Sequence, residues 1–336
     1  MFPCRFLQAL ALILLLSSCS PGVTDASAVL ETARESTPIP AHASDIGQSP
    51  QTALESTPAP GEGSLPALVL PAHPEPTLPP LPAGQGGPLS YRYWRWWPVI
   101  PDVSRTTYQI YQRGLELGLD RHAFSIIGDC QSMPPVFGGR YDHAGRYQLP
   151  EAYEDLQQTI DRFKGSFDRS SVTVQNGFSV TAALSPLWAD PEICQPGETP
   201  LDCELRIHRP IFVIITLGTN WKNGDAVRHN QYLEQIIDRI IASGAVPILS
   251  TKGDNEEGDH SINLGIAEIA AERDLPLWNF WRAIQELPNH GLDVARDGNY
   301  LSVAAWDVRS FTGLQVLDSL WRMLDPDGEP DPTLRQ

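Results

Sequence analysis

The sequence predicts an α/β fold, a three-layer α/β/α domain with a mostly parallel central sheet. Two observations predict it. Short, continuously apolar runs such as residues 211–215 are typical of strands buried on both faces. Segments with one apolar face at helical spacing, such as residues 231–241, alternate with these runs. In such a sheet ligands bind beyond the carboxyl ends of the strands, so the residues that follow each strand are candidates for a site.

The predicted elements cover most of the C-terminal two thirds of the chain. The helices are predicted at residues 107–117, 151–163, 231–241, 262–271 and 311–323. The strands are predicted at residues 123–127, 172–174, 211–215, 246–249 and 275–278. Because helices separate most successive strands, the connections are long enough for parallel pairing.

The N-terminus predicts export. Arg5 precedes an apolar run at residues 7–16 that is too short to span a bilayer, as in a secretory signal. The residues Leu-Ser-Ser-Cys that end at Cys19 resemble a bacterial lipobox, which implies cleavage before Cys19 and a lipid on its sulfur. The alternative is an ordinary signal peptide with an incidental cysteine. We predict a lipoprotein signal at residues 1–18 and an extracytoplasmic protein anchored to the bacterial cell membrane.

Composition divides the rest of the chain. Residues 19–90 are rich in Pro, Ala, Ser, Thr, Glu and Gly and lack aromatic residues, which predicts a disordered tether. Residues 91–325 have the length of one compact domain, and residues 326–336 are predicted to be a flexible tail. The segment 91–98 alternates aromatic residues with Arg and could stack on sugar rings. We interpret it instead as a strap that packs onto the domain.

Charge narrows the choice of partners. The formal net charge is −17, which argues against nucleic acid, since binding phosphates needs clustered Lys and Arg. We expect a substrate that is a small-molecule, glycan or lipid ester, and membrane contact through the lipid on Cys19. We expect a monomer without a cofactor.

The cysteines of the predicted domain have different roles. Cys194 and Cys203 bracket a Pro- and Gly-containing segment, and we predict that they form a local disulfide in an oxidising compartment. Cys130 is then unpaired, so it is either buried or reactive. A zinc site is not indicated, because no Cys-x-x-Cys or paired His spacing is present.

Three strand ends carry residues that suit acyl chemistry. The first predicted strand runs into Gly128, Asp129 and Cys130, which presents a thiol nucleophile at a strand end. Gly177 follows the second strand and Asn220 follows the third. Taken singly, Gly and Asn in such loops are usually turn residues. Together with Cys130, at three successive strand ends, they have the composition of an oxyanion hole.

These residues resemble the motifs of the SGNH (GDSL-like) hydrolases, over roughly residues 120–324. That family carries Gly-Asp-Ser, Gly, Gly-x-Asn and Asp-x-x-His, and the present chain reads Gly128-Asp129-Cys130, Gly177, Gly218-Thr219-Asn220 and Asp297-Gly298-Asn299-Tyr300. The resemblance implies an SGNH or flavodoxin-like fold and hydrolysis of esters or acyl groups. It also implies that Cys130 is the nucleophile, that Cys130, Gly177 and Asn220 form the oxyanion hole, and that Asp297 and Tyr300 occupy the Asp and His positions.

The chain departs from the family twice. Cys130 replaces the serine, which is tolerable because a thiolate is a strong nucleophile. Tyr300 replaces the histidine, which is more damaging because a phenol titrates at about pH 10 and is a poor base at neutral pH. His290, in the same connection, is a candidate replacement base or a polar loop residue. His260 is a candidate substrate contact or the cap of a helix that begins at Ser261.

Three functional hypotheses therefore remain open. The first is an SGNH-type ester hydrolase that is catalytically impaired or uses His290. The second is a non-catalytic binding protein that retains the pocket, and the third is a sensor that uses the Cys130 thiol. Asp129 and Trp221 are further candidates for substrate binding, since they flank Cys130 and Asn220 in the sequence.

Overall fold

The computed structural model describes residues 90–221, 225–296 and 298–325. Their strands are β1 (Asp120–Gly128), β2 (Pro210–Thr216), β3 (Val246–Ser250) and β4 (Leu277–Trp278). They form one parallel sheet in the order β1-β2-β3-β4. The predicted signal, the lipidation site Cys19, the tether and the tail lie outside the described residues.

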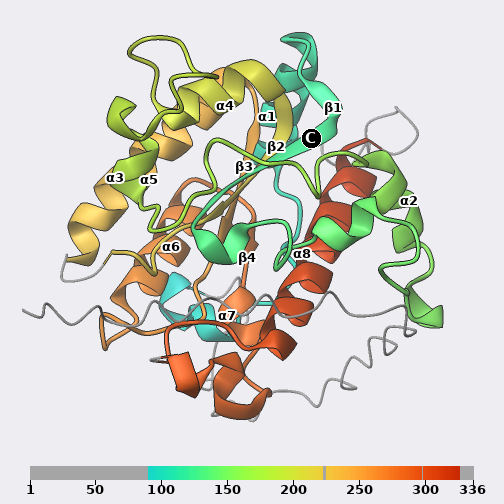
Figure 1. The fold of residues 1–336 in the computed structure, drawn as a ribbon, viewed down its shortest axis with the longest axis vertical. Helices are drawn as coiled ribbons and strands as arrows, with labels where there is room; N and C mark the ends of the chain where they lie inside the picture. The colour runs from blue at the N-terminus through green and yellow to red at the C-terminus, as the bar shows by residue number, and fades with distance from the viewer. Residues whose placement is uncertain (1–89, 222–224, 297, 326–336) are drawn as a thin grey trace, which may run out of the picture. The chain divides into compact units, whose positions relative to one another are not determined.

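Helices cover the sheet on both sides, as the sequence predicts. They are α1 (Arg105–Glu116), α2 (Leu156–Arg162), α3 (Val180–Ala183), α4 (Pro200–His208), α5 (Ala226–Ser243), α6 (Ser261–Glu272), α7 (Phe280–Ala283) and α8 (Val303–Leu324). Figure 1 shows α2 and α8 on one side of the strands and α3, α5 and α6 on the other. In the described part of the chain, no helix combines the length and apolarity that crossing a membrane requires.

Both faces of β1 are covered, so the strand is buried throughout its second half. The ring of Phe124 packs against the rings of Phe163 and Phe167, which follow α2. The next residue, Ser125, points to the other face, where its hydroxyl donates a 2.6 Å hydrogen bond to the fully buried Glu204 of α4. Successive side chains of a strand alternate in this way, so both faces must be compatible with burial.

The predicted strand at residues 172–174 is wrong as a full strand. Val174 forms only an isolated parallel bridge with Gly128. The reason is a local turn, because the Val174 N–H bonds the carbonyl of Ser171 at 3.2 Å instead of a neighbouring strand. The segment still runs beside β1, since the Gly128 N–H donates to the Thr173 carbonyl at 3.0 Å. The residues that follow it are therefore still delivered to the carboxyl end of the sheet.

Other predicted elements differ from the structure in extent. The predicted helix at 151–163 is broken into a 3-10 turn at Glu151–Tyr153 and the shorter α2. Helix α4 was not predicted, because its first residues belong to the interval between Cys194 and Cys203. Its sequence signal is a Thr199 cap, whose hydroxyl accepts the Asp202 N–H at 3.1 Å, followed by proline at the first helical position.

The aromatic segment that precedes α1 is a strap, as predicted. It forms a 3-10 helix at Tyr91–Trp96, in which Trp94 is 1% exposed. The Trp94 ring lies 5.0 Å from that of Trp281, and the Asn279 side-chain amide donates to the Trp94 carbonyl at 2.7 Å. The strap therefore closes the core beside α7 and does not offer its central tryptophan to a ligand.

Candidate active site

The turn after β1 places Cys130 at the carboxyl end of the sheet. Gly128 must be glycine, because a Cβ there would overlap the hydroxyl oxygens of Ser132 and Thr216, which are 2.8 Å apart. Asp129 then caps the short 3-10 helix Cys130–Ser132, and its Oδ1 accepts the Gln131 N–H at 2.9 Å. The thiol of Cys130 is consequently held at the start of a fixed turn, half-buried and without a disulfide partner.

Arg309 of α8 holds this turn in place by hydrogen bonds. Its guanidinium donates to the Gln131 carbonyl and, at 3.1 Å, to the Ser132 hydroxyl. The cation lies over the ring of Phe137 at 4.7 Å and near that of Phe280 at 5.6 Å. Burial lowers the pKa of Arg309 to about 10, which leaves it charged at neutral pH. The position of Cys130 therefore depends on a buried cation that no motif indicates.

A small cavity opens at Cys130 and encloses about 310 Å³, including the space that opens to solvent. Its lining residues are Asp129, Cys130, Gln131, Asn176, Thr219, Asn220, Asn299 and Tyr300. The structure thus brings together Cys130, Asn220 and Tyr300, which come from three separate strand ends or loops.

The side-chain amide of Asn220 already donates hydrogen bonds to other groups of the protein. Its Nδ2 donates to Asp129 Oδ2 at 3.1 Å and to the Phe178 carbonyl at 3.3 Å. An amide nitrogen carries two hydrogens, so both are used. Donation to the oxyanion of a reacting ester would require one of these bonds to be replaced.

Gly177 does not itself line the cavity, although its neighbour Asn176 does. The structure shows why glycine stands at position 177. Its φ is +73°, a left-handed conformation that side-chain-bearing residues rarely adopt, whereas an added Cβ would meet nothing within 4 Å. Its conformation, and not close packing, therefore requires glycine.

The loop before α8 carries Tyr300 to the cavity. Gln131 links this loop to the nucleophile turn, because its Oε1 accepts the Leu301 N–H at 2.7 Å and its Nε2 donates to the Asn299 carbonyl at 3.3 Å. The guanidinium of the exposed Arg296 lies 3.9 Å from the centre of the Tyr300 ring. Asp297, predicted at the Asp position of the resembled motif, lies outside the described residues.

The part of the chain that the structure describes contains the histidines His122, His143, His208, His229, His260 and His290. None of these lines the Cys130 cavity. His290 Nδ1 is 3.1 Å from the Gln285 carbonyl, within its own connection. A role for His290 as the base stays a prediction, and it would require this connection to rearrange.

The other predicted substrate contacts also lie apart from the cavity lining. His260 precedes α6, and its ring packs against those of Trp94 and Trp281, at 6.0 and 5.7 Å. Its side chain does not cap the helix. Trp221 donates from its indole nitrogen to the Asp225 carbonyl at 3.0 Å. Of the three residues predicted to contact substrate, Asp129 alone is a lining residue.

Electrostatics keep the Cys130 thiol protonated. Burial raises its pKa, and the neighbouring Asp129 carboxylate raises it further, while Arg296 opposes both effects. Burial also raises the pKa of Asp129 itself, although the Arg309 charge lowers it. A thiol with a raised pKa has less thiolate at neutral pH than a free cysteine, so it is less nucleophilic.

A second cavity, of about 350 Å³, is also bordered by Asp129 and is lined in part by Arg309, Lys252 and Asp254. Asp254 is only 3% exposed, and its carboxylate pairs with Lys252 Nζ at 2.5 Å and accepts the Thr219 hydroxyl at 2.6 Å. Asp254, held by this ion pair, orients Thr219, which precedes Asn220.

Near Asn220, His229 is also fully buried, and its Nε2 has no hydrogen-bond partner among the described residues. Burial lowers the pKa of His229 to about 4, so the ring is neutral at pH 7. It touches the ring of Trp221 and does not reach the Cys130 cavity.

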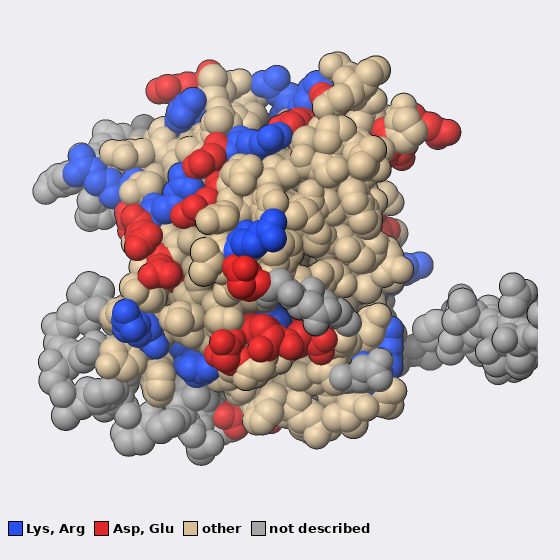
Figure 2. All heavy atoms as spheres, turned by 90° about the vertical axis from the view of Figure 1, so that its left-hand side faces the viewer, with Lys and Arg blue, Asp and Glu red and all other residues tan. Residues whose placement is uncertain are grey.

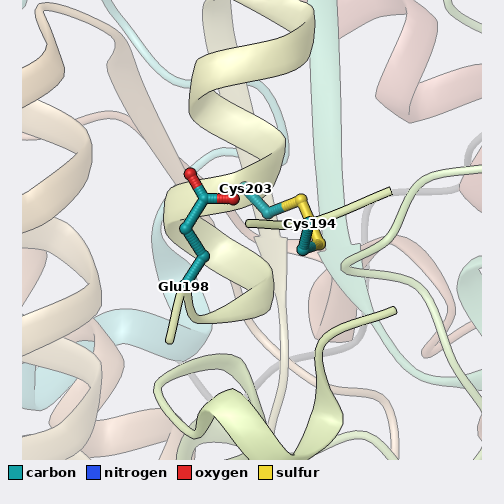
Figure 3. A group of neighbouring side chains, drawn as sticks. All are labelled: Cys194, Glu198 and Cys203. Atoms are coloured by element: carbon teal, nitrogen blue, oxygen red, sulfur yellow. A yellow bond between two sulfur atoms is a disulfide. The ribbon is translucent and has the colours of Figure 1, made fainter. Parts of the chain in front are cut away.

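The predicted disulfide between Cys194 and Cys203 is present, with its Cα atoms 5.3 Å apart. Figure 3 shows Glu198 beside the joined sulfur atoms. These three residues are close enough to hold a metal ion, but sulfurs in a disulfide do not supply thiolate ligands. The Glu198 carboxylate is bound to Arg206 at 2.6 Å. In the oxidised protein this cluster is therefore a structural link.

Sequence reasoning missed several residues of the site. Gln131 and Asn299 adjoin the motif residues Cys130 and Tyr300, and this adjacency is the only signal that could have indicated them. Arg309 offers a second kind of signal, because it is a cation among buried positions of α8, although the helix predicted at residues 311–323 begins after it.

Comparison with family models and with curated proteins finds no match. Among solved structures, the chain is similar to a GDSL-like lipase from Bacteroides thetaiotaomicron VPI-5482, at 11% identity and a TM-score of 0.39, covering 63% of this chain and 98% of that one. It is also similar to the psychrotrophic esterase EstA from Pseudoalteromonas sp., at 14% identity and a TM-score of 0.41, covering 59% and 97%.

A third similar structure is a catalytic mutant of an acetylxylan esterase from Geobacillus stearothermophilus, at 15% identity and a TM-score of 0.38, covering 58% and 93%. At these identities and TM-scores the similarities carry no conclusion about the activity of this chain.

Proposed function

We propose that this protein is an exported, membrane-anchored SGNH-type domain that binds an acylated extracellular ligand at Cys130 and hydrolyses it slowly at most. The observation that carries the proposal is the residue in the base position. Tyr300 lines the cavity there under the guanidinium of Arg296. No described histidine lines this cavity, so we expect none to accept a proton from the thiol or to donate one to a leaving alkoxide unless the connection that carries His290 rearranges.

The same cavity supports binding. The side-chain amides of Asn176, Asn220 and Asn299 line it, and amides both donate and accept hydrogen bonds. Asn299 is 8% exposed, and its Oδ1 has no hydrogen-bond partner among the described residues. A buried acceptor without a donor is costly, so a ligand hydroxyl or amide N–H in this cavity would satisfy it.

Turnover would require steps that the described residues support poorly. Attack by Cys130 Sγ on an ester carbonyl forms a tetrahedral intermediate, and loss of the alkoxide leaves a thioester on the enzyme. The alkoxide needs a proton, and the water that later cleaves the thioester needs a base. The protonated thiol and the engaged amide of Asn220 both oppose the first step.

Export and anchoring are supported by the N-terminal sequence and by the disulfide between Cys194 and Cys203. Disulfides persist in oxidising compartments and are rare in the cytosol. If Cys19 carries the anchor, Cys19→Ala moves the protein from the membrane fraction to the aqueous fraction when bacterial cells expressing it are fractionated. Retention of the variant in the membrane fraction would contradict the anchor.

The catalytic part of the proposal is tested with a chromogenic acetate ester. Wild type, Cys130→Ser and Tyr300→His are expected to hydrolyse it near the rate without protein. The Cys130→Ser/Tyr300→His double variant restores a hydroxyl and an imidazole, and its rate should rise by about 10²-fold or more.

The matched control is Cys130→Ala/Tyr300→His, which keeps the imidazole and lacks a nucleophile, and which should stay at the background rate. Rapid hydrolysis by wild type that disappears in Cys130→Ala would overturn the proposal and identify a working thiol hydrolase.

A further inference from the structure

His229 is a buried histidine that lies outside the lining of the Cys130 cavity. It belongs to the first turn of α5 and is fully buried, and its Nδ1 is 3.2 Å from the side-chain oxygen of Asn230. An amide oxygen only accepts, so Nδ1 carries the ring hydrogen and Nε2 carries a lone pair. Among the described residues, none hydrogen-bonds to this Nε2. The neutral ring therefore has one free position, which a proton would fill.

The free nitrogen lies against the loop at residues 218–221. Gly218 has a φ of +136°, and a Cβ added there would lie 3.9 Å from His229 Nε2 and 3.0 Å from Lys252 Cδ. At the other end of the loop, the Trp221 ring lies 6.0 Å from the His229 ring. The Trp221 N–H donates to the Gly218 carbonyl at 3.0 Å, which closes the loop on itself. The 218–221 loop thus covers the imidazole from both of its ends.

A buried ion network holds the same loop. The Lys252 ammonium is 2.5 Å from a carboxylate oxygen of Asp254 and 2.5 Å from one of Glu257. Asp254 in turn accepts the Thr219 hydroxyl at 2.6 Å. Thr219 directly precedes Asn220, and both residues line the candidate site. The position of Asn220 therefore depends on the charges around Lys252.

A proton on His229 would disturb this network. Burial lowers the pKa of His229 to about 4; the Asn230 oxygen opposes this effect, Lys252 adds to it and Glu257 opposes it. Glu257 is the anion available to a charged ring, but pairing with the ring would weaken its bond to Lys252. A buried charge without a partner is costly. Acid therefore favours an arrangement in which the ring reaches water, and the loop that covers Nε2 has to move.

His260 is a second histidine beside the network. Burial lowers its pKa, and the charges that act on it are those of Arg95, Glu257, Lys252 and Asp254. Its ring packs against aromatic rings of the strap and of α7. It therefore experiences the same charges as His229 but does not support the 218–221 loop, which makes it a comparison for His229.

We propose that His229 is an acid-sensitive positioning residue of the candidate site: its protonation releases the 218–221 loop and withdraws the Asn220 amide from the cavity. The inference rests on the function proposed above, since that function makes the cavity a ligand site and exposes the domain to the pH outside the cell. The site is assembled near neutral pH and is lost in acid.

The direction and size of the effect follow from the two pKa values of the ring. In the closed loop the pKa is about 4, and in the open loop it returns to the ordinary value of 6.5. The neutral ring thus favours the closed loop, and this advantage is lost as the pH falls from 6.5 toward 4. Between pH 7 and pH 5 the ratio of open to closed loop should rise by about twentyfold.

Hydrogen exchange of the full chain in detergent, read by mass spectrometry at pH 7 and pH 5, tests the proposal. After correction for the intrinsic exchange rate at each pH, protection of the 218–221 loop should fall by about tenfold or more. Protection of β3 should change much less. The range stays above the ordinary pKa of carboxyl groups, about 4, so protonation of the acidic residues does not account for the change.

Two matched variants assign the effect to one ring. His229→Gln removes the titrating group, so its loop should have the same protection at both pH values. His260→Gln should lose protection as wild type does. If His260→Gln abolishes the loss, or if His229→Gln loses protection as wild type does, the proposal is overturned.

A second measurement on wild type decides the question if His229→Gln is unfolded. Exchange of the imidazole C2 hydrogen, followed by mass spectrometry over a pH series, gives the titration midpoint of His229. It should lie well below 6.5, and a midpoint at 6.5 or above would contradict the proposal. Unchanged loop protection in wild type between pH 7 and pH 5 would also contradict it.

The two proposals fail separately, because neither of these measurements involves ester hydrolysis. An inactive Cys130→Ser/Tyr300→His variant removes the impaired-hydrolase function and leaves the loop measurements unaffected. Hydrolysis by that variant, with a loop that does not respond to pH, removes the role of His229 and leaves the function in place.

Discussion

The turn that carries Cys130 and the loop that carries Tyr300 face the same cavity but are held in different ways. The turn is bonded to two other elements. Arg309 of α8 donates to it, and its Ser132 hydroxyl is hydrogen-bonded to the hydroxyl of Thr216 at the end of β2. The loop is joined to the turn mainly through the side chain of Gln131. Its Tyr300 lies under an exposed arginine.

The difference shows that the two sides of the cavity depend on the fold to different degrees. The backbone around Cys130 is set by hydrogen bonds to other elements, so changes in those partners should destabilise the domain. Tyr300 is one side chain on a peripheral loop, and it can be exchanged without disturbing the core.

The largest expected effect concerns the turn. Arg309→Met keeps the length of the side chain but leaves the Gln131 carbonyl and the Asp129 carboxylate without their buried cation. We expect the free energy of unfolding to fall by about 3 kcal/mol, measured by urea denaturation.

Arg322→Met, on the same helix, is the control for Arg309. Its partly exposed ion pair with Asp318 should contribute about 1 kcal/mol or less. Equal losses in the two variants would show that Arg309 has no special part in holding the turn.

An intermediate effect is expected where the two regions join. Gln131→Leu has a similar volume but leaves the Leu301 N–H and the Asn299 carbonyl without partners. The free energy of unfolding should fall by about 1–3 kcal/mol, and hydrogen exchange should accelerate at residues 299–301 more than in β1.

The exposed Gln235→Leu on α5 is the comparison for this variant and should change neither quantity. Uniform acceleration over the whole domain would mean that Gln131 stabilises the fold generally and does not join the loop to the turn.

The smallest effect concerns the charge at the thiol. Removing the Asp129 charge with Asp129→Asn should lower the pKa of Cys130, because one of the two causes that raise it disappears while burial stays. Alkylation of Cys130 by iodoacetamide, followed by mass spectrometry across a pH series, should then reach its midpoint at a lower pH than in wild type.

Asp238→Asn, on the outer part of α5 and paired with Arg273, should leave that midpoint in place. A wild-type midpoint at or below the value of free cysteine, about pH 8.5, would contradict the protonated thiol and favour the sensor hypothesis.

One face of the molecule carries charges of both signs. Figure 2 shows Lys and Arg interspersed with Asp and Glu on this face, without a continuous basic area. A face of this kind does not offer the clustered cations that bind nucleic-acid backbones, and the exclusion of nucleic acid stays a prediction.

Much of the fold could be predicted because a strand buried on both faces appears in the sequence as a short apolar run. The apolar runs of β1, β2 and β3 specify strands buried on both faces, and these three were predicted to within a few residues. The segment at residues 172–174 has the same composition, but its backbone is diverted into a turn. Local composition cannot show which backbone groups find a partner in a neighbouring strand.

The candidate site was predictable to the extent that it follows strand order. Cys130 and Asn220 come directly after parallel strands, whose carboxyl ends meet at one edge of the sheet. Their meeting with Tyr300 in one cavity was therefore expected. The placement of His290 was not predictable, because its connection has no periodic pattern from which its path could be read.

The sequence by itself determined the layered α/β architecture, the thiol in the nucleophile position, the phenol in the base position and the local disulfide. Each of these depends on residue identity or on spacing within a short segment. Only the tertiary structure decided that Arg309 holds the turn 178 residues earlier in the chain. It also decided that the Asp129 carboxylate and the Phe178 carbonyl accept both hydrogens of the Asn220 side-chain amide. These contacts depend on how distant segments pack, and no local pattern records that packing.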